Sequence, residues 1–199
     1  MAIERPPRDI TPDAFFRDWL PAQYRAAAAT TGTPPDTTVV VELTGEGGGQ
    51  WTVETHGGEL TVRPGRAEQA DLVLSLSVDD WRAALCGEDG AADLLPQQVD
   101  PAKLLVAADP QTRQLLEATA GTLTFEIPGF NGRTWSIAVS LKGSAEPAAT
   151  ITIDADTLAQ IRSGELAAPQ AYFAGKIQIA GDANFAMQLA MSLMARQPA

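Results

Sequence analysis

The sequence predicts an α/β protein made of two related halves, in each of which short strands lead into a helix. Segments rich in β-branched residues at 37–43, 50–55, 58–64 and 71–77 are separated by glycine-containing breaks, which is typical of strands. After Gly121 the same succession of strands followed by a helix returns. These two observations define the fold class, and the elements follow from local signals along the chain.

Thr11 begins the first expected helix as its N-cap, with Pro12 at the first helical position, where a missing N–H costs nothing. Aromatic and aliphatic residues then recur at helical spacing. Pro21 lies inside this run and should kink or split the helix near Leu20. The stretch 30–36 contains glycine and two prolines and is expected to be a loop.

The four strands between 37 and 77 are expected to form an antiparallel meander. Ser77, followed three residues later by Asp80, predicts that the last strand passes directly into a capped helix that ends at Gly87. Residues 90–100 are expected to connect this half to the next. Two further helices are expected at 101–107 and 110–119.

Strands are expected again at 122–127, 134–141 and 149–154, with Asp154 as the cap of a helix that stops at Gly164. A shift of 77 positions lays Leu74 on Ile151 and Gly87 on Gly164, and a shift of 84 lays Trp51 on Trp135. A repeat of this length is typical of a domain-sized duplication rather than of a solenoid. We therefore expect two halves, at residues 1–100 and 101–199.

The chain closes with a strand through Ile177 and Ile179, a break at Gly181, and a helix capped by Asp182. Asn184, Gln188 and Ser192 form one narrow polar stripe on that helix, and nearly all its other residues are apolar. Because a helix that packs on one side needs a narrower apolar face, we expect both flanks to be covered.

Composition excludes several classes of protein. The 199 residues include 25 acidic and 14 basic side chains, a net charge of −11, which disfavours nucleic acids and anionic lipid headgroups as partners. One cysteine and one histidine exclude an internal disulfide and a Cys/His zinc site, so no metal or cofactor is expected. Neutral or apolar partners remain possible, and the oligomeric state is left open.

The first ten residues, MAIERPPRDI, lack the apolar core of a secretory signal, and no window is apolar for long enough to span a membrane. We therefore expect a soluble, cytoplasmic protein without stable membrane insertion.

The second half resembles the sterol carrier protein type-2 family of sterol- and lipid-binding domains. The resemblance is carried by Ile151-Thr-Ile-Asp154, Ser163-Gly164, Pro169-Gln-Ala-Tyr-Phe173, Gly175-Lys-Ile-Gln-Ile-Ala-Gly-Asp182 and Phe185-Ala-Met187. It covers about residues 110–197. Residues 12–89 resemble the same family more loosely and lack the Gly-Lys-Ile segment and the apolar last helix. The resemblance implies a mostly antiparallel sheet, helices on one face, and an apolar tunnel closed by the last helix.

The predicted function is non-catalytic binding or transfer of a hydrophobic ligand, such as a fatty acyl chain, a sterol-like lipid or another apolar metabolite, in the second half. Strand alternation and the apolar face of the last helix select the ligand-facing candidates, which are Trp135, Ile137, Ile151, Ile153, Phe173, Ile177, Phe185, Leu189 and Leu193. The alternative is a protein-interaction or accessory module in which the core is filled and no lipid is bound.

Catalytic chemistry is the weakest interpretation. Asp79, Asp80, Asp154, Asp156 and Asp182 stand at the starts of predicted helices, where a carboxylate is favourable without a catalytic role. Neither His56 nor Cys86 has a visible partner for nucleophilic catalysis. Gly175-Lys176 lacks the rest of a phosphate-binding loop, so Lys176 is expected to cap a turn or to lie along the sheet edge.

Overall fold

The computed structural model describes residues 5–28, 36–86, 118–130 and 132–194, with side chains given except at 27–28 and 190–194. The first helical run comprises α1 (Pro12–Ala14), the π-helical turn η1 (Phe15–Trp19) and α2 (Leu20–Ala28). The strands that follow are β1 (Thr37–Thr44), β2 (Gly49–His56), β3 (Glu59–Pro64) and β4 (Leu72–Ser77), succeeded by α3 (Val78–Cys86). The second set is β5 (Gly121–Phe130), β6 (Arg133–Leu141), β7 (Ala148–Ile153), α6 (Ala155–Ser163), α7 (Ala168–Phe173), β8 (Ile177–Gly181) and α8 (Ala183–Met194).

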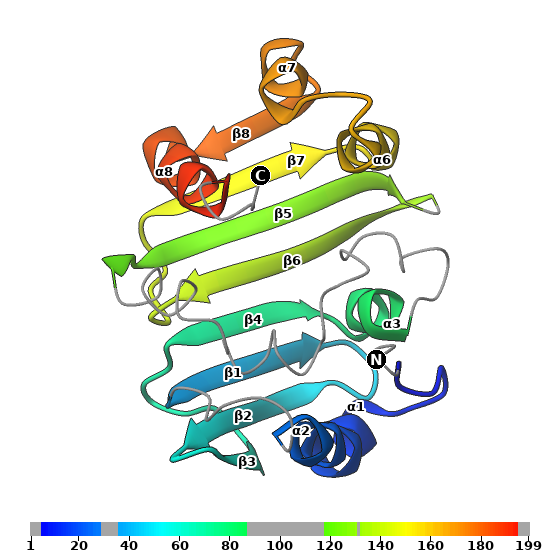
Figure 1. Cartoon of the computed structure of the whole chain (residues 1–199), viewed down its shortest axis with the longest axis vertical. Helices are drawn as coiled ribbons and strands as arrows, with labels where there is room; N and C mark the ends of the chain where they lie inside the picture. Colours follow the sequence, from blue (N-terminus) through cyan, green and yellow to red (C-terminus); the bar gives the residue numbers. More distant parts are fainter. Residues whose placement is uncertain (1–4, 29–35, 87–117, 131, 195–199) are drawn as a thin grey trace.

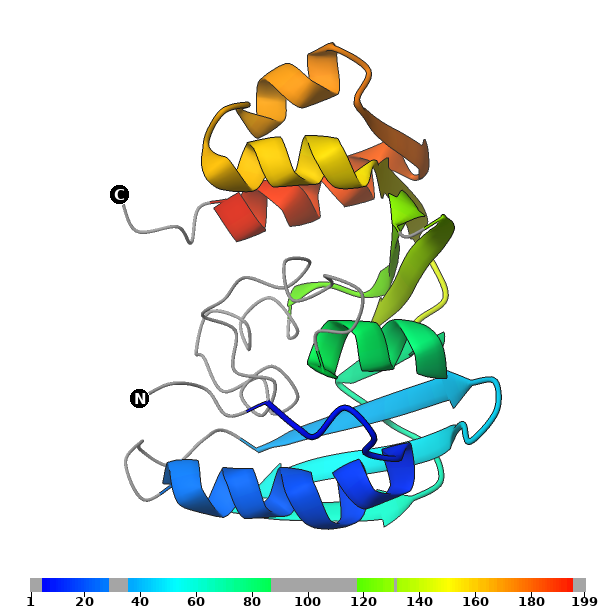
Figure 2. The ribbon, with the colours of Figure 1, turned by 90° about the vertical axis from the view of Figure 1, so that its right-hand side faces the viewer.

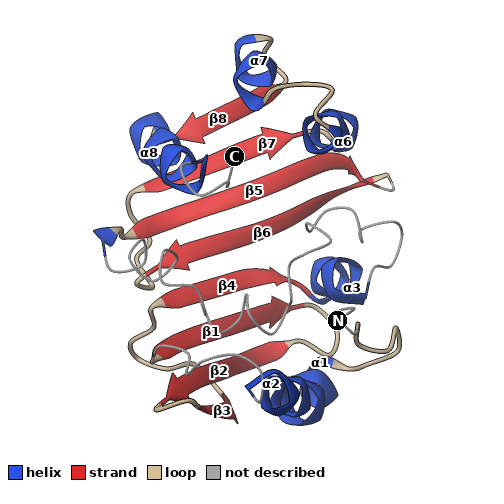
Figure 3. Cartoon of the chain, in the orientation of Figure 1, coloured by secondary structure: helices blue, strands red, loops and turns tan. Residues whose placement is uncertain are grey.

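The eight strands of the described residues form one sheet in the order β3-β2-β1-β4-β6-β5-β7-β8 (Figures 1 and 3). The β1–β4 and β5–β7 pairs are parallel, and the other five pairs are antiparallel. Figure 2 shows the sheet from the side, with the helices gathered on one face. The α/β class, the mostly antiparallel sheet and the cover of helices on one face are thereby confirmed.

The strands of the first half are confirmed, but the expected meander is wrong. β4 does not pair with β3; it lies beside β1 in parallel, with Leu72 opposite Val39. The connection after Pro64 is too long for a tight hairpin and passes across the face of the sheet opposite the helices. There Ala67 packs against Val40 and Val73. A strand that begins with three consecutive buried apolar residues suits such an interior position better than an edge.

Pro21 splits the first helix as predicted. Thr11 caps α1 by accepting the backbone N–H of Ala14 at 3.2 Å. The backbone of Pro21 has no N–H to donate to the carbonyl of Arg17, and its ring would clash with that carbonyl in a regular α-helix. The chain widens into the π-helical turn η1 immediately before this point, where the N–H of Leu20 bonds the carbonyl of Phe15.

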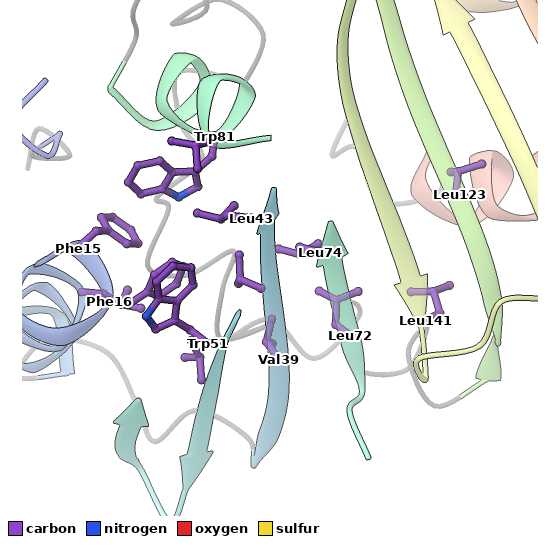
Figure 4. Packing of buried hydrophobic residues seen from close by; sticks show 14 of the residues in the cluster. Phe15, Phe16, Val39, Leu43, Trp51, Leu72, Leu74, Trp81, Leu123 and Leu141 are labelled. Carbon is purple, nitrogen blue, oxygen red and sulfur yellow. The ribbon is translucent and has the colours of Figure 1, made fainter. Parts of the chain in front are cut away.

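The core is a continuous layer between the sheet and the helices, and its most aromatic part lies in the first half (Figure 4). Phe15 and Phe16 are fully buried. The Phe16 ring stacks on Trp51 of β2 with centroids 4.7 Å apart, and Phe15 meets Trp81 of α3 edge to face at 5.3 Å. The same cluster extends through Leu123 and Leu141 to α8, so both halves share one hydrophobic core.

The predicted helix signals of the second half are confirmed. Asp154 accepts the backbone N–H of Thr157 at 2.8 Å, and Gly164 ends α6 in the left-handed conformation at φ 80°. Asp182 accepts the N–H of Phe185 at 2.9 Å. In the first half Ser77 likewise accepts the N–H of Asp80 at 3.0 Å.

Several other expectations fall outside the described residues. They are the loop at 30–36 except its last residue, the stop at Gly87, the connection at 90–100, the helix at 101–107, and all but the end of the helix at 110–119.

Candidate apolar binding site

Five apolar side chains form a row across the helix-covered face of the sheet, one from each of five adjacent strands. Strand pairing places Leu76 opposite Ile137, Ile137 opposite Phe125, Phe125 opposite Ile151, and Ile151 opposite Ile179. We call these five residues the middle row. Because neighbouring strands are about 4.8 Å apart, the row is about 19 Å long.

Helices cover the sheet on both sides of the middle row. On one side Phe185 and Leu189 of α8 pack in the same cluster as Leu123 and Ala149. On the other side α3 and α6 pack on Ile127, Trp135 and Ile153, through Ala83, Ala84, Leu158 and Ile161. Figure 1 shows α8 and α6 over opposite ends of β7.

The middle row is less buried than the rows beside it. All five of its members are partly buried. In the flanking rows Leu123, Ile127, Trp135 and Ala149 are at most 5% exposed, although Val139 and Ile177 in those rows are also partly buried. The centre of a covered sheet is normally its most buried part. An apolar row left partly accessible between two covered rows, and containing no charged side chain, can take up an elongated apolar molecule by the hydrophobic effect alone.

The structure brings most of the predicted ligand-facing residues to this region. Ile137 and Ile151 belong to the middle row. Trp135 and Ile153 are buried, and Ile177 is partly buried, in the cluster under α6. Phe185 and Leu189 belong to α8 and are buried, at 5% and 6% exposure.

Two predicted residues are not brought together with the others. Phe173, at the end of α7, is 86% exposed. The side chain of Leu193 lies outside the described residues.

Sequence reasoning missed three members of the middle row. Phe125 and Ile179 follow the same strand alternation that selected Ile137 and Ile151, so the signal was present. Leu76 belongs to the first half, and only the β4–β6 pairing brings it opposite Ile137. No local pattern predicts that pairing.

Asp80 corrects the expectation that the acidic residues at helix starts act as caps. Its side chain turns inward, is 8% exposed and pairs with Arg133 at the start of β6. The second carboxylate oxygen accepts the N–H of Ser136 at 3.4 Å, and the Asp80 carbonyl accepts the indole N–H of Trp135 at 2.9 Å. These contacts join α3 of the first half to β6 of the second beside the apolar site.

Asp154 and Lys176 take part in local hydrogen bonds. Hydrogen bonds donated by Thr157, first from its backbone N–H and then from its hydroxyl, lower the pKa of Asp154 below its ordinary value. Lys176 donates its backbone N–H to Ala171 in a turn, and its ammonium lies 3.5 Å from the Gln160 amide oxygen. Both observations agree with a turn position for Lys176 at the edge of the sheet.

Neither His56 nor Cys86 belongs to the apolar site. His56 is 91% exposed and lies 2.8 Å from Asp36. The shallow pocket around it is lined by acidic and threonine side chains, which do not suit an apolar ligand. Cys86 is buried, with its sulfur 3.6 Å from the Pro7 carbonyl oxygen. Within the described part of the chain no group of His, Cys, Asp and Glu could hold a metal ion, and no helix is long and apolar enough to cross a membrane.

A mixed sheet with helices on one face and a half-buried apolar row between them is an architecture that can accommodate a hydrophobic molecule. Residues 102–194 match the model of the SCP-2 sterol transfer family. The search of curated proteins gives no match.

Two solved structures are similar to parts of the chain. The solution structure of sterol carrier protein domain 2 of Helicoverpa armigera is 27% identical over 44% of this chain and 80% of that one, with a TM-score of 0.34. A double mutant of the sec-alkyl sulfatase PisA1 is 16% identical over 91% of this chain, with a TM-score of 0.25. This chain spans 16% of that protein.

Proposed function

We propose that this protein binds, and transfers, a hydrophobic ligand such as a fatty acyl chain or a sterol-like lipid, without catalysing a reaction. The observation that carries the proposal is the middle row, which is apolar and uncharged but only partly buried between two covered rows. The match of residues 102–194 to a sterol transfer family supports the same class of ligand.

The length of the row fits an extended acyl chain. An extended alkyl chain gains about 0.8 kcal/mol for each buried CH₂ group, so about 16 carbons correspond to roughly 13 kcal/mol before association and ordering costs are subtracted. Part of that gain is enough for tight binding without any polar anchor. The proposed ligand would lie across the strands from Leu76 towards Ile179, with Phe185 and Leu189 of α8 closing one side of the site.

The decisive experiment combines identification of bound lipid with a matched pair of variants. Protein as purified is extracted and its lipids are identified by mass spectrometry, and binding of a fluorescent fatty acid is measured with unlabelled competitor. Ile151→Trp places an indole in the middle row, and we expect it to weaken binding at least about tenfold, since one blocked position removes several CH₂ contacts.

Thr150→Trp is the control, because it places the same side chain in the same strand on the opposite face of the sheet. We expect its affinity to equal that of the wild type. Circular dichroism checks that both variants are folded. Absence of a saturable, displaceable signal in the wild type, or equal loss in both variants, contradicts the proposed ligand site.

A second candidate function is an accessory or protein-interaction module that carries no lipid. One observation favours it: Phe185, Ala186 and Leu189 of α8 are at most 6% exposed and pack within the protein's own core. Native mass spectrometry separates the two functions. A monomer that carries lipid mass supports the carrier, whereas a lipid-free dimer supports the module.

We also propose that the chain arose by duplication, with halves at residues 1–100 and 101–199. The parallel pairs support it, because Val39 opposite Leu72 in β1–β4 corresponds to Leu123 opposite Ala149 in β5–β7, at the shifts of 84 and 77 found in the sequence. The hairpins differ in register by two residues. Trp51 lies opposite Val41, whose equivalent is Phe125, but Trp135 lies opposite Ile127.

A further inference from the structure

α7 carries the most exposed large hydrophobic side chain in the described part of the chain. Phe173 is 86% exposed and its neighbour Tyr172 is 40% exposed, with ring centroids 5.7 Å apart. Single exposed apolar residues are common, but two adjacent aromatic side chains held outward at one site indicate an interaction surface.

The fold holds this pair outward rather than leaving it on a loose turn. Ala171, the residue before the pair, is fully buried and fixes the inner side of α7. After the helix, Gly175 donates its N–H to the carbonyl of Tyr172 and Lys176 donates its N–H to the carbonyl of Ala171. The aromatic pair therefore projects from a hydrogen-bonded turn.

The charge around α7 differs from that of the whole chain. The chain has a net charge of −11, yet residues 160–181 contain only Arg162, Glu165 and Lys176 as charged side chains. Asp182 follows this segment directly and the carboxylate of Asp154 interacts with Lys176, so the basic and acidic charges around α7 nearly balance. The segment around α7 is therefore close to neutral, which suits contact with an electrically neutral surface.

The position of α7 connects this surface to the apolar site. α7 packs against β8, the edge strand of the sheet, and stands beyond it in Figure 1. Ile179 of β8 is the last member of the middle row. A surface that contacts α7 therefore lies next to the end of the row.

We propose that Tyr172 and Phe173 form a membrane-docking site that inserts reversibly into the interfacial region of an electrically neutral lipid bilayer. This inference rests on the proposed function, because docking there would bring the end of the middle row close to lipids in the bilayer. Aromatic side chains favour the boundary between headgroups and acyl chains, and insertion of a short helix end needs no membrane-spanning segment.

The test measures binding of the full chain to phosphatidylcholine vesicles by sedimentation, and binding of a fluorescent fatty acid in the absence of vesicles. We expect Phe173→Ser to reduce vesicle binding about tenfold, since one large aromatic side chain no longer enters the bilayer. Gln170→Ser is the matched control, because it changes another exposed residue of α7 without removing an apolar group, and it should bind vesicles like the wild type. Adding phosphatidylserine should weaken wild-type binding at low salt, because the whole chain is acidic.

The two assays distinguish failure of docking from failure of the proposed function. Fatty-acid binding without vesicles should be the same in Phe173→Ser and in the wild type. Absent vesicle binding in a wild type that still binds fatty acid overturns the docking site, as does equal vesicle binding by wild type and Phe173→Ser. A wild-type dimer that becomes monomeric in Phe173→Ser overturns it too, because the aromatic pair would then be a protein interface. Vesicle binding that depends on Phe173 in a protein without fatty-acid binding supports the docking site and contradicts the carrier function.

Discussion

Replacing Arg133 by methionine tests whether its ion pair with the buried carboxylate of Asp80 holds the two halves together. The Asp80 side chain is 8% exposed and that of Arg133 is 35% exposed. Removing the guanidinium leaves a buried carboxylate whose remaining partner is the N–H of Ser136 at 3.4 Å. Breaking a buried pair in this way costs about 3 to 5 kcal/mol, and the partial exposure of Arg133 favours the lower end of that range.

Thermal and urea unfolding measure this loss. For a chain of this length, 3 kcal/mol corresponds to a Tm lower by roughly 6 to 12 °C. Arg63→Met is the matched control, because Arg63 pairs with Glu54 on the surface, where the two side chains are 47% and 34% exposed. We expect about 1 kcal/mol or less there. A loss below 1 kcal/mol for Arg133→Met, or equal losses for the two variants, would refute the reasoning.

Three further predictions concern the aromatic core, the tight packing around Gly121, and the cap of α6. Phe16→Ala should lower the free energy of unfolding, measured by urea titration, by about 3 to 5 kcal/mol, because a fully buried ring stacked on Trp51 is lost. A loss under about 1 kcal/mol would contradict that packing. Gly121→Ala should lower the Tm and weaken fatty-acid binding, because its new Cβ would lie 2.5 Å from the Pro147 carbonyl oxygen and 2.9 Å from the Phe185 ring. Gly129→Ala is the control, because Gly129 also has a positive φ but a Cβ there meets nothing within 4 Å. We expect Gly129→Ala to leave fatty-acid binding unchanged. Asp154→Ala should cost about 1 kcal/mol at pH 7. The pKa of Asp154 is lowered in the folded protein, so the stabilisation that its carboxylate gives is present above the carboxyl's ordinary pKa and is lost as the pH falls through the lowered value. The free energies of unfolding of wild type and Asp154→Ala, measured by urea titration, should therefore converge in acid.

The sequence predicts the elements of this protein better than their arrangement, because the signals for elements are local. Thr11, Asp154 and Asp182 each cap the helix that follows them, since a cap needs only a side chain within three residues of the bonded N–H. The place of β4 beside β1 instead involves contacts between separate segments, such as the packing of Ala67 against Val40 and Val73. No periodicity within one segment encodes such a contact.

The candidate site was likewise predicted where the signal is local and missed where it depends on contacts between distant segments. Strand alternation selects the correct face of β6 and β7, so Ile137 and Ile151 are found in the middle row. Alternation does not say which of the apolar positions on that face is least covered, because coverage depends on where α8 and α6 cross the strands. The inward turn of Asp80 was missed for a related reason: its partner, Arg133, is more than fifty residues away in the sequence.

The pairing of β4 with β6 makes the first half part of the candidate site. The pairing runs from Leu72 opposite Leu141 to Leu76 opposite Ile137, and it extends the middle row by one strand beyond β6. The Asp80–Arg133 pair lies close to the β4–β6 pairing. Loss of this ion pair would therefore shift Leu76 relative to Ile137 as well as lower stability. A ligand that spans the middle row would in turn contact both β4 and β6, and it would bind only when these two strands are paired. We therefore expect fatty acid to raise the Tm of the wild type more than that of Arg133→Met, since a ligand stabilises in proportion to its affinity for the folded state.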